Sequence, residues 1–249
     1  MGLEVYVDLM SQPCRALVIF LKKNNIPFVQ KTVELAKGQN YSEEFLAVNS
    51  LAKVPAILDD GFALAECVAI LRYLLARYSS LVPDHWYPAD VQQRARVDEY
   101  LSWQHTSVRP HAAKVFWLEV LIPIYTREPV EPEKVKEALE DLENTLVAMQ
   151  CKFLKDQPFL CGQEISVADI LALCELMQPV ACGHDPLAPH PLLVAWRART
   201  EEVLGADLLA EVNACIMGAH DKLKNYLHPQ GEGTLAVPPA IKHLQKLTR

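Results

Sequence analysis

The chain has 249 residues, a length that fits one large domain or two small ones. Hydrophobic residues make up 51% and charged residues 22%, a globular composition that excludes intrinsic disorder. The formal net charge is −7 without any basic cluster, which argues against a nucleic-acid partner. Charged residues and prolines interrupt the longest apolar stretches, so we expect no membrane span.

The first 80 residues alternate strand and helix signals. Strands are predicted at Leu3–Asp8, Phe28–Leu35, Pro55–Leu58 and Phe62–Leu64, and helices at Gln12–Asn24 and Glu66–Tyr78. Residues 37–49 are polar and predict a loop with a short helical turn. Two strands joined by a helix can pair in parallel, whereas the hairpin around Asp59-Asp60-Gly61 is antiparallel. This order predicts an α/β thioredoxin-like domain with a mixed four-stranded sheet.

Strand signals stop after a proline-containing linker at 81–89, and helical spacing follows. Helices are predicted at Asp90–Leu121 with a kink at Pro110, at Pro132–Leu154, from a capping box at Ser166, at Pro191–Val203 and at Asp207–Leu227. Residues 1–80 have balanced charge, so the net −7 falls on the rest of the chain. We therefore predict a domain at 1–80 and an all-helical domain at 90–249 that ends in a loose tail from 228.

Seven cysteines stand at irregular spacings, with no CxxC pair. The odd number favours free thiols, and the opening residues MGLEV lack the basic and apolar parts of a secretory signal. We therefore expect a cytoplasmic protein. The histidines are scattered and no HExxH, P-loop or GxSxG is present, so we expect no metal site.

The first candidate site follows the first strand. In a thioredoxin-like fold, this turn opens a helix whose free N–H groups favour an anion. Ser11 stands where a redox-active turn would have the first cysteine of a CxxC pair, and its hydroxyl can donate to a bound thiolate. Two alternatives stay open: Ser11 is only a helix cap, or Cys14 is the nucleophile.

Two further candidate sites lie in the same half. The Val54-Pro55 bond is expected to be cis, which leaves the Val54 backbone free to pair with an extended peptide; the alternative is a plain strand-start proline. Glu66 and Cys67 open the last helix of this domain, where N–H groups can bind a carboxylate. The alternative for Glu66 is an ordinary dipole-stabilising acid.

Four ordered segments carry a family resemblance: MGLEVYVDLMSQPCRA, NSLAKVPAILDDGFALAEC, RARVDEYLSWQH and ISVADILALCELMQPV. Each resembles a segment of the theta-class glutathione transferases, and the resemblance covers nearly the whole chain, thinning at 228–249. It implies a glutathione-binding domain, an all-helical domain that holds the electrophile, and a homodimer. It also implies that Ser11 is the catalytic serine, which holds glutathione as its thiolate.

The resemblance assigns further roles. It implies that the Val54 backbone pairs with the cysteinyl part of glutathione, that Lys53 lies beside the glycyl carboxylate, and that Glu66 and Cys67 hold the γ-glutamyl end. It implies a contact from the partner subunit near Gln104 to Ser107. Phe116 and Trp117 are candidate walls of the electrophile pocket.

Two positions depart from the family pattern. Cys67 replaces the usual serine, and a lost hydrogen bond to a charged group costs about 1.5–3 kcal/mol. Asn40 stands at a glutathione-site position where relatives often have histidine. The sequence therefore predicts conjugation of glutathione to small electrophiles (alkyl halides, epoxides, hydroperoxides) in detoxification. The alternatives are a transferase-fold binding protein with weak or lost catalysis and a thiol transferase that depends on Cys14.

Overall fold

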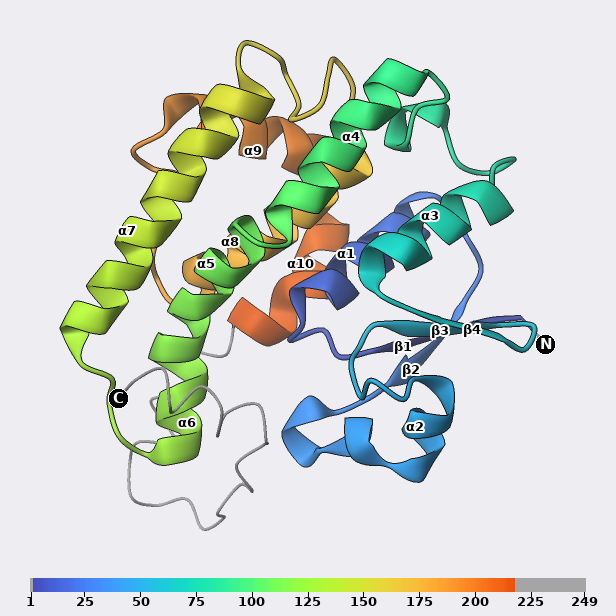
Figure 1. The fold of residues 1–249 in the computed structure, drawn as a ribbon, viewed down its shortest axis with the longest axis horizontal. Coiled ribbons are helices and arrows are strands. Elements are labelled where there is room, and N and C mark those ends of the chain that lie inside the picture. The colour runs from blue at the N-terminus through green and yellow to red at the C-terminus, as the bar shows by residue number, and fades with distance from the viewer. Residues whose placement is uncertain (1, 218–249) are drawn as a thin grey trace.

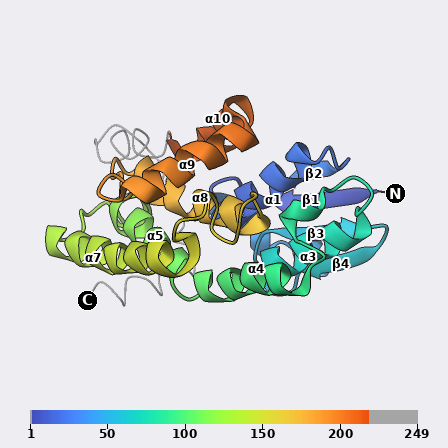
Figure 2. The same ribbon diagram turned by 90° about the horizontal axis from the view of Figure 1, so that it is seen from above.

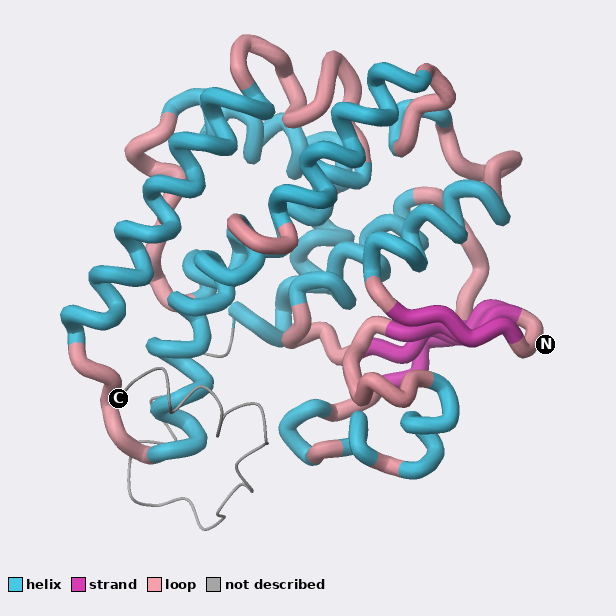
Figure 3. Tube along the Cα trace, in the orientation of Figure 1, coloured by secondary structure: helices cyan, strands magenta, loops and turns pink. Residues whose placement is uncertain are grey.

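The computed structural model describes residues 2–217, which form a four-stranded sheet beside a larger group of helices (Figure 1). The strands lie together at one end, and helices make up most of the rest of the described chain (Figure 3). The predicted tail from 228 and the second half of the predicted helix Asp207–Leu227 lie outside the described residues. Within residues 2–217, no helix is long and apolar enough to cross a membrane.

The sheet has the order β2-β1-β3-β4. Its strands are β1 (Leu3–Val7), β2 (Val29–Thr32), β3 (Ala56–Asp59) and β4 (Phe62–Ala65). β1 and β2 are parallel, whereas β3 is antiparallel to both β1 and β4. This mixed sheet confirms the predicted thioredoxin-like arrangement.

The second strand is shorter than the sequence predicts. It ends at Thr32 because its partner β1 ends at Val7, and the last backbone bond between them runs from Val33 N–H to the Val7 carbonyl, 2.9 Å. Beyond it the chain has no ladder partner and makes a short 3₁₀ turn at Leu35–Lys37. The prediction of a strand up to Leu35 is therefore wrong at its end.

Helices cover both faces of the sheet (Figure 1). α1 (Gln12–Lys23) and α3 (Cys67–Arg77) lie on the face towards the helical part, and α2 (Glu43–Val48) lies on the other. The alternation of β1 fits this arrangement, because Val5 and Val7 join the main core while Tyr6 packs with Phe45 of α2, ring centroids 6.0 Å apart.

Helices also make up the remainder of the described chain. They are α4 (Val91–Gln104), α5 (Val108–Phe116), α6 (Ile122–Thr126), α7 (Pro132–Ala148), α8 (Val167–Ala181), α9 (Pro191–Leu204) and α10 (Ala206–Met217). π-Helical turns extend α5 at Trp117–Leu121 and α7 at Met149–Leu154. The all-helical second part is thereby confirmed.

The single helix predicted at Asp90–Leu121 is wrong, because the chain breaks between Gln104 and Val108. Proline lacks an N–H group, and its ring clashes with the carbonyl four residues earlier. The break places Pro110 in the first turn of α5, where a missing N–H group costs nothing. The interruption therefore precedes the proline instead of kinking a continuous helix at it.

α8 is the central helix, since nearly all its side chains are buried and it packs against both α1 and α5. Figure 2 shows it between the two parts of the molecule. Its predicted capping box is confirmed: Ser166 N–H donates to Asp169 Oδ2, 2.8 Å. Asp169 Oδ1 also accepts from Leu160 N–H and from Trp196 Nε1, at 2.9 and 2.8 Å. A buried carboxylate thus fixes the start of α8.

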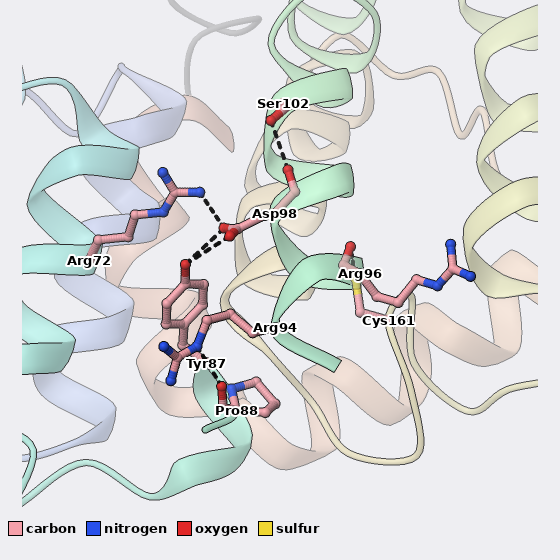
Figure 4. Close-up of polar contacts among 8 residues, drawn as sticks. All are labelled: Arg72, Tyr87, Pro88, Arg94, Arg96, Asp98, Ser102 and Cys161. Atoms are coloured by element: carbon pink, nitrogen blue, oxygen red, sulfur yellow. Dashed lines mark hydrogen bonds and ion pairs between the residues drawn. The ribbon is translucent and has the colours of Figure 1, made fainter. Parts of the chain in front are cut away.

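A polar cluster fastens the segment between α3 and α4 (Figure 4). Arg72 of α3 forms an ion pair with Asp98 of α4, and the Tyr87 hydroxyl bonds both oxygens of that carboxylate at 2.9 and 3.0 Å. Arg94 donates to the Pro88 carbonyl, 2.7 Å, and its guanidinium lies 5.0 Å from the Tyr87 ring centroid. These contacts fix how α3 and α4 meet beside the candidate site.

Candidate active site

Ser11 begins α1 in extended backbone, with φ −86° and ψ 125°, and its side chain makes no capping bond to the helix. Its own N–H donates to the Asp8 carbonyl, 2.9 Å, and its carbonyl accepts from Arg15 N–H, 3.1 Å. The backbone therefore holds Ser11 in place, and the half-buried hydroxyl is not used to cap the helix. This geometry argues against the alternative that Ser11 is only a cap.

Cys14 lies one helical turn further in and is fully buried. Burial raises the pKa of its thiol to about 12, and hydrogen bonding from the Asp8 backbone and the Ser11 side chain offsets this only in part. A thiol with this pKa is protonated at neutral pH, whereas the thiolate is the nucleophilic form. The environment of Cys14 therefore disfavours its use as the nucleophile.

The segment before β3 holds the predicted cis bond between Val54 and Pro55. Two asparagine side chains support this segment from outside it. Asn49 Nδ2 donates to the Lys53 carbonyl, 2.7 Å, and Asn40 Nδ2 donates to the Ala52 carbonyl, 2.9 Å. Asn40 is buried and directs its amide to this loop, and Asn49 is a contributor that no sequence pattern indicates.

A groove brings the predicted segments together. It is lined by Pro13, Asn49, Lys53, Val54, Pro55, Glu66, Cys67, His105 and Arg109. These residues come from α1, the loop before β3, the start of α3 and the α4–α5 break. The structure thus joins Lys53, Val54, Glu66 and Cys67, while neither Ser11 nor Asn40 lines the groove.

Glu66 precedes the first helical residue of α3 with φ 69° and ψ 111°, an unusual backbone conformation for a residue other than glycine. Such strain is concentrated at functional sites, where the surrounding structure maintains it. The Cys67 thiol is buried and donates to the Pro13 carbonyl, with 3.4 Å between sulfur and oxygen. Burial raises the pKa of this thiol. Glu66 is exposed at the groove, whereas the Cys67 side chain is turned towards α1.

His105 and Arg109 also line the groove. His105 falls within the Gln104–Ser107 range that the resemblance indicates for a partner contact, whereas no sequence pattern indicates Arg109. Both flank the break between α4 and α5. Arg109 Nε donates to Glu175 Oε1 of α8 at 2.8 Å, and this pair directs a guanidinium to the groove. Their position follows from the way α5 packs on α8, which no local sequence signal contains.

Gln104 and Ser107 lie at the same break. Gln104 is fully buried in its own protomer, and neither its Oε1 nor its Nε2 has a hydrogen-bond partner in the described residues. Ser107 is half-buried and precedes α5 without a side-chain cap. The Gln104 side chain is thus not presented on the protomer surface, and the Ser107 side chain is partly accessible.

Phe116 and Trp117 belong to a separate apolar cluster beside the turn that carries Ser11. Phe116 is buried in it, and Met10, Trp117 and Met177 pack against it while partly buried. Met10 directly precedes Ser11, so the cluster adjoins the proposed position of the sulfur. In the described residues no three histidine, cysteine or acidic side chains gather to hold a metal.

A thioredoxin-like sheet with a serine at its first helix, joined to an all-helical part, is the architecture of glutathione transferases. Residues 1–76 match the glutathione S-transferase N-terminal domain, and residues 111–202 match the C-terminal domain. Mouse glutathione S-transferase theta-3 is 50% identical over 221 residues, which are 89% of this chain and 91% of the relative. Human theta-2 is 48% identical over 249 residues, 100% of this chain and 98% of the relative.

A solved structure of the human theta-class enzyme, in complex with the glutathione conjugate of 1-menaphthyl sulfate, has the same fold. Its TM-score is 0.89 at 43% identity, and the match covers 100% of this chain and 98% of the other. The chain therefore belongs to the theta class of the glutathione S-transferase family.

Proposed function

We propose that this chain conjugates glutathione to small electrophiles in detoxification, among them alkyl halides, epoxides and hydroperoxides. The observation that carries the proposal is Ser11, whose hydroxyl is free of the helix cap at the start of α1. In a displacement, the sulfur forms a bond to carbon while the leaving group departs with its electron pair. The same thiolate opens an epoxide, whose oxygen then takes up a proton.

Ser11 acts by donating its hydroxyl hydrogen to the glutathione sulfur and so favours the thiolate. A thiol with a pKa of about 8.5 is roughly 3% ionised at pH 7, and lowering the pKa by about two units raises this to roughly 75%. The free N–H groups at the start of α1 favour the same negative charge. Ser11 therefore increases the fraction of glutathione that can react.

The groove binds the rest of the tripeptide. The Val54 backbone pairs with the cysteinyl part, the Lys53 ammonium lies near the glycyl carboxylate, and Glu66 faces the γ-glutamyl ammonium. The backbone N–H of Cys67 bonds the γ-glutamyl carboxylate, because its thiol already donates to Pro13. Asn40 contributes by holding the loop that carries Lys53 and Val54.

Phe116 and Trp117 form part of the electrophile pocket, with Met10 between them and the sulfur. Their apolar cluster supports this role. The human theta-class relative solved with the glutathione conjugate of 1-menaphthyl sulfate binds a conjugate that carries an aromatic group.

We further propose a cytoplasmic homodimer with domains at 1–80 and 90–249 and a linker at 81–89. All seven cysteines are free thiols, which fits a reducing compartment. The resemblance to the family implies the dimer, and of the two expected contact residues Ser107 is half-buried whereas Gln104 is fully buried.

Ser11→Ala tests the proposal, with Ser11→Thr as the variant that keeps a hydroxyl. We expect Ser11→Ala to lower kcat/KM at pH 7 at least tenfold and to leave the free energy of unfolding within about 1 kcal/mol, because no cap bond is lost. Conjugation is followed with a panel of halides and epoxides, and the reduction of hydroperoxides to alcohols is followed by the formation of glutathione disulfide from two glutathione molecules. Equal turnover in the Ser11→Ala and wild-type chains contradicts the serine mechanism, and retention on immobilised glutathione without any turnover favours a binding protein.

A further inference from the structure

Arg15 is a fully buried arginine on α1, four residues after Ser11. Its Nη1 donates to the carbonyls of Leu9 and Met10, at 2.9 and 3.2 Å. Its backbone N–H donates to the Ser11 carbonyl, 3.1 Å. One residue thus bonds three successive residues of the turn that ends in Ser11.

The same guanidinium reaches the helical part of the molecule. Arg15 Nη2 donates to the carbonyl of Cys174 on α8, 2.9 Å. α1 and α8 pack directly against one another, as both views show (Figure 1, Figure 2). Arg15 therefore connects the serine turn to a helix of the other part of the fold.

The charge of Arg15 is not neutralised by a bonded carboxylate in the described chain. Its hydrogen-bond acceptors are three carbonyls, and the ionisable groups that face it are Cys14 on α1, Cys174 and Glu175 on α8, and Cys215 on α10. Burial raises the pKa of all three thiols, so they are neutral at pH 7. Glu175 is bonded to Arg109 instead. A guanidinium stays protonated in proteins, so a positive charge lies under the turn.

A neutral side chain bonds the same turn and provides a comparison. Gln178 of α8 donates from Nε2 to the Met10 carbonyl, 3.4 Å. Like Arg15, Gln178 donates to the Met10 carbonyl and so links this turn to α8. Its side chain is uncharged, and its hydrogen bond to Met10 is longer than that of Arg15. A variant of Gln178 therefore perturbs the packing of the turn without removing the guanidinium.

We propose that Arg15 is a positioning residue for catalysis: it fixes the Leu9–Ser11 turn against α8 and thereby aligns the Ser11 hydroxyl with the glutathione thiolate. Its charge adds to the field that favours the anion. The inference rests on the proposed function, in which Ser11 holds the thiolate. A residue that only filled the core would affect stability but not the ionisation of bound glutathione.

The test measures the pKa of glutathione bound to the enzyme, from the ultraviolet absorbance of the thiolate, together with kcat and KM. Arg15→Lys keeps the charge but cannot make the forked set of bonds to two elements. We expect it to raise the thiol pKa by about one unit, a tenfold fall in the ratio of thiolate to thiol, with a lower kcat and a nearly unchanged KM for glutathione. Arg15→Met also removes the charge and is expected to raise the pKa further. Gln178→Met is the matched control, with a much smaller shift.

A double variant shows whether Arg15 acts through Ser11. In the Ser11→Ala background, Arg15→Lys is expected to change the thiol pKa little, because the hydroxyl that it aligns is gone. Thermal unfolding confirms that each variant is folded. The proposal is overturned by a wild-type thiol pKa in folded Arg15→Lys, by an equal shift in Gln178→Met, by additive effects in the double variant, or by failure of both Arg15 variants to fold. A Ser11→Ala chain with the wild-type thiol pKa instead removes the proposed function itself.

Discussion

Arg109 of α5, which lines the groove, forms an ion pair with Glu175 of α8, with 2.8 Å between Nε and Oε1. The Glu175 side chain is 0% exposed and the Arg109 side chain is 24% exposed. Burial raises the pKa of Glu175, and the charge and hydrogen bond of Arg109 oppose that rise. The pair therefore holds α5 to α8 and places a cation at the groove.

Removing one partner of this pair is expected to be far worse than removing both. Arg109→Met leaves the buried carboxylate without a cation, and we expect the free energy of unfolding to fall by about 3–5 kcal/mol. The double variant Arg109→Met/Glu175→Leu is expected to recover most of that loss, because it leaves no unpaired charge in an apolar site. Urea unfolding measures both. A single variant as stable as the double one contradicts the prediction.

The loss in Arg109→Met is also expected to depend on pH. Because the folded-state pKa of Glu175 is raised, the folded chain keeps this proton at pH values where the unfolded chain has lost it. Stability from this group is therefore complete below its ordinary pKa of 4.5 and falls as pH rises through the folded value. Removing Arg109, which opposes the rise, raises the folded-state pKa of Glu175 further, so the variant loses more stability than wild type as pH rises above 4.5. We therefore expect the difference between Arg109→Met and wild type to shrink from pH 7 to pH 4. A constant difference contradicts the assignment to Glu175.

Cys67→Ser tests the position at which the chain departs from its relatives. A hydroxyl is a stronger donor than a thiol, although here it shares its hydrogen between the Pro13 carbonyl and the ligand. We expect the Kd for glutathione, measured by calorimetry, to fall about fivefold in Cys67→Ser. This gain in binding free energy is smaller than that of an unshared hydrogen bond to a charged group. Cys67→Ala is the control and is expected to bind like wild type. Equal affinity in the two variants argues against a role for this side chain.

The parts of the fold that depend on local pattern could be predicted from the sequence. The alternation of apolar residues in β1 predicts a strand with one buried face, and the apolar run after Ser166 predicts a buried helix. The end of β2 at Thr32 could not, because it is fixed by the length of its partner strand. The break before Val108 is similar: Pro110 signals a disturbance, but where the chain relieves it depends on packing against α8.

The candidate site divides in the same way. Ser11, Val54 and Glu66 stand at element ends that a sequence reveals, so their segments could be placed beforehand. Arg109 enters the groove from a different helix. Asn49 supports the loop before β3 through one hydrogen bond from its side-chain amide to a backbone carbonyl. Neither contact has a periodicity or a motif, because both arise only when distant segments pack together.

The loop before β3 is expected to control glutathione affinity more than turnover. Asn49→Ala removes the 2.7 Å bond to the Lys53 carbonyl, and Asn40→Ala removes the 2.9 Å bond to the Ala52 carbonyl. We expect each to raise the KM for glutathione about fivefold with kcat nearly unchanged, since a lost bond of this kind costs about 1 kcal/mol. Gln93→Ala, on the exposed face of α4, is the control. A fall in kcat at constant KM argues that the loop acts on the reacting sulfur instead.

Cys14→Ala separates the serine mechanism from the thiol-transferase alternative. The Cys14 thiol is fully buried and its pKa is raised to about 12, so we expect turnover within twofold of wild type and no mixed disulfide with glutathione. Loss of conjugation together with a trapped Cys14–glutathione disulfide contradicts this.

The same variant makes a prediction for stability. The folded thiol ionises near pH 12, whereas an unfolded one ionises near its ordinary value of 9.0. Below pH 9.0 both states keep the proton, and above it the unfolded chain loses its proton first, so stability falls between these two values. At pH 7 the Cys14→Ala chain is expected to be less stable than wild type by about 1 kcal/mol, because the buried sulfur is lost. At one pH unit above the unfolded-state pKa, ionisation of the unfolded wild-type thiol lowers the stability of wild type by about 1.4 kcal/mol. The advantage of wild type over Cys14→Ala is therefore expected to vanish near pH 10, as measured by urea unfolding at pH 7, 9 and 10. An advantage that persists unchanged at pH 10 means that the Cys14 thiol ionises as readily in the folded chain as in the unfolded one.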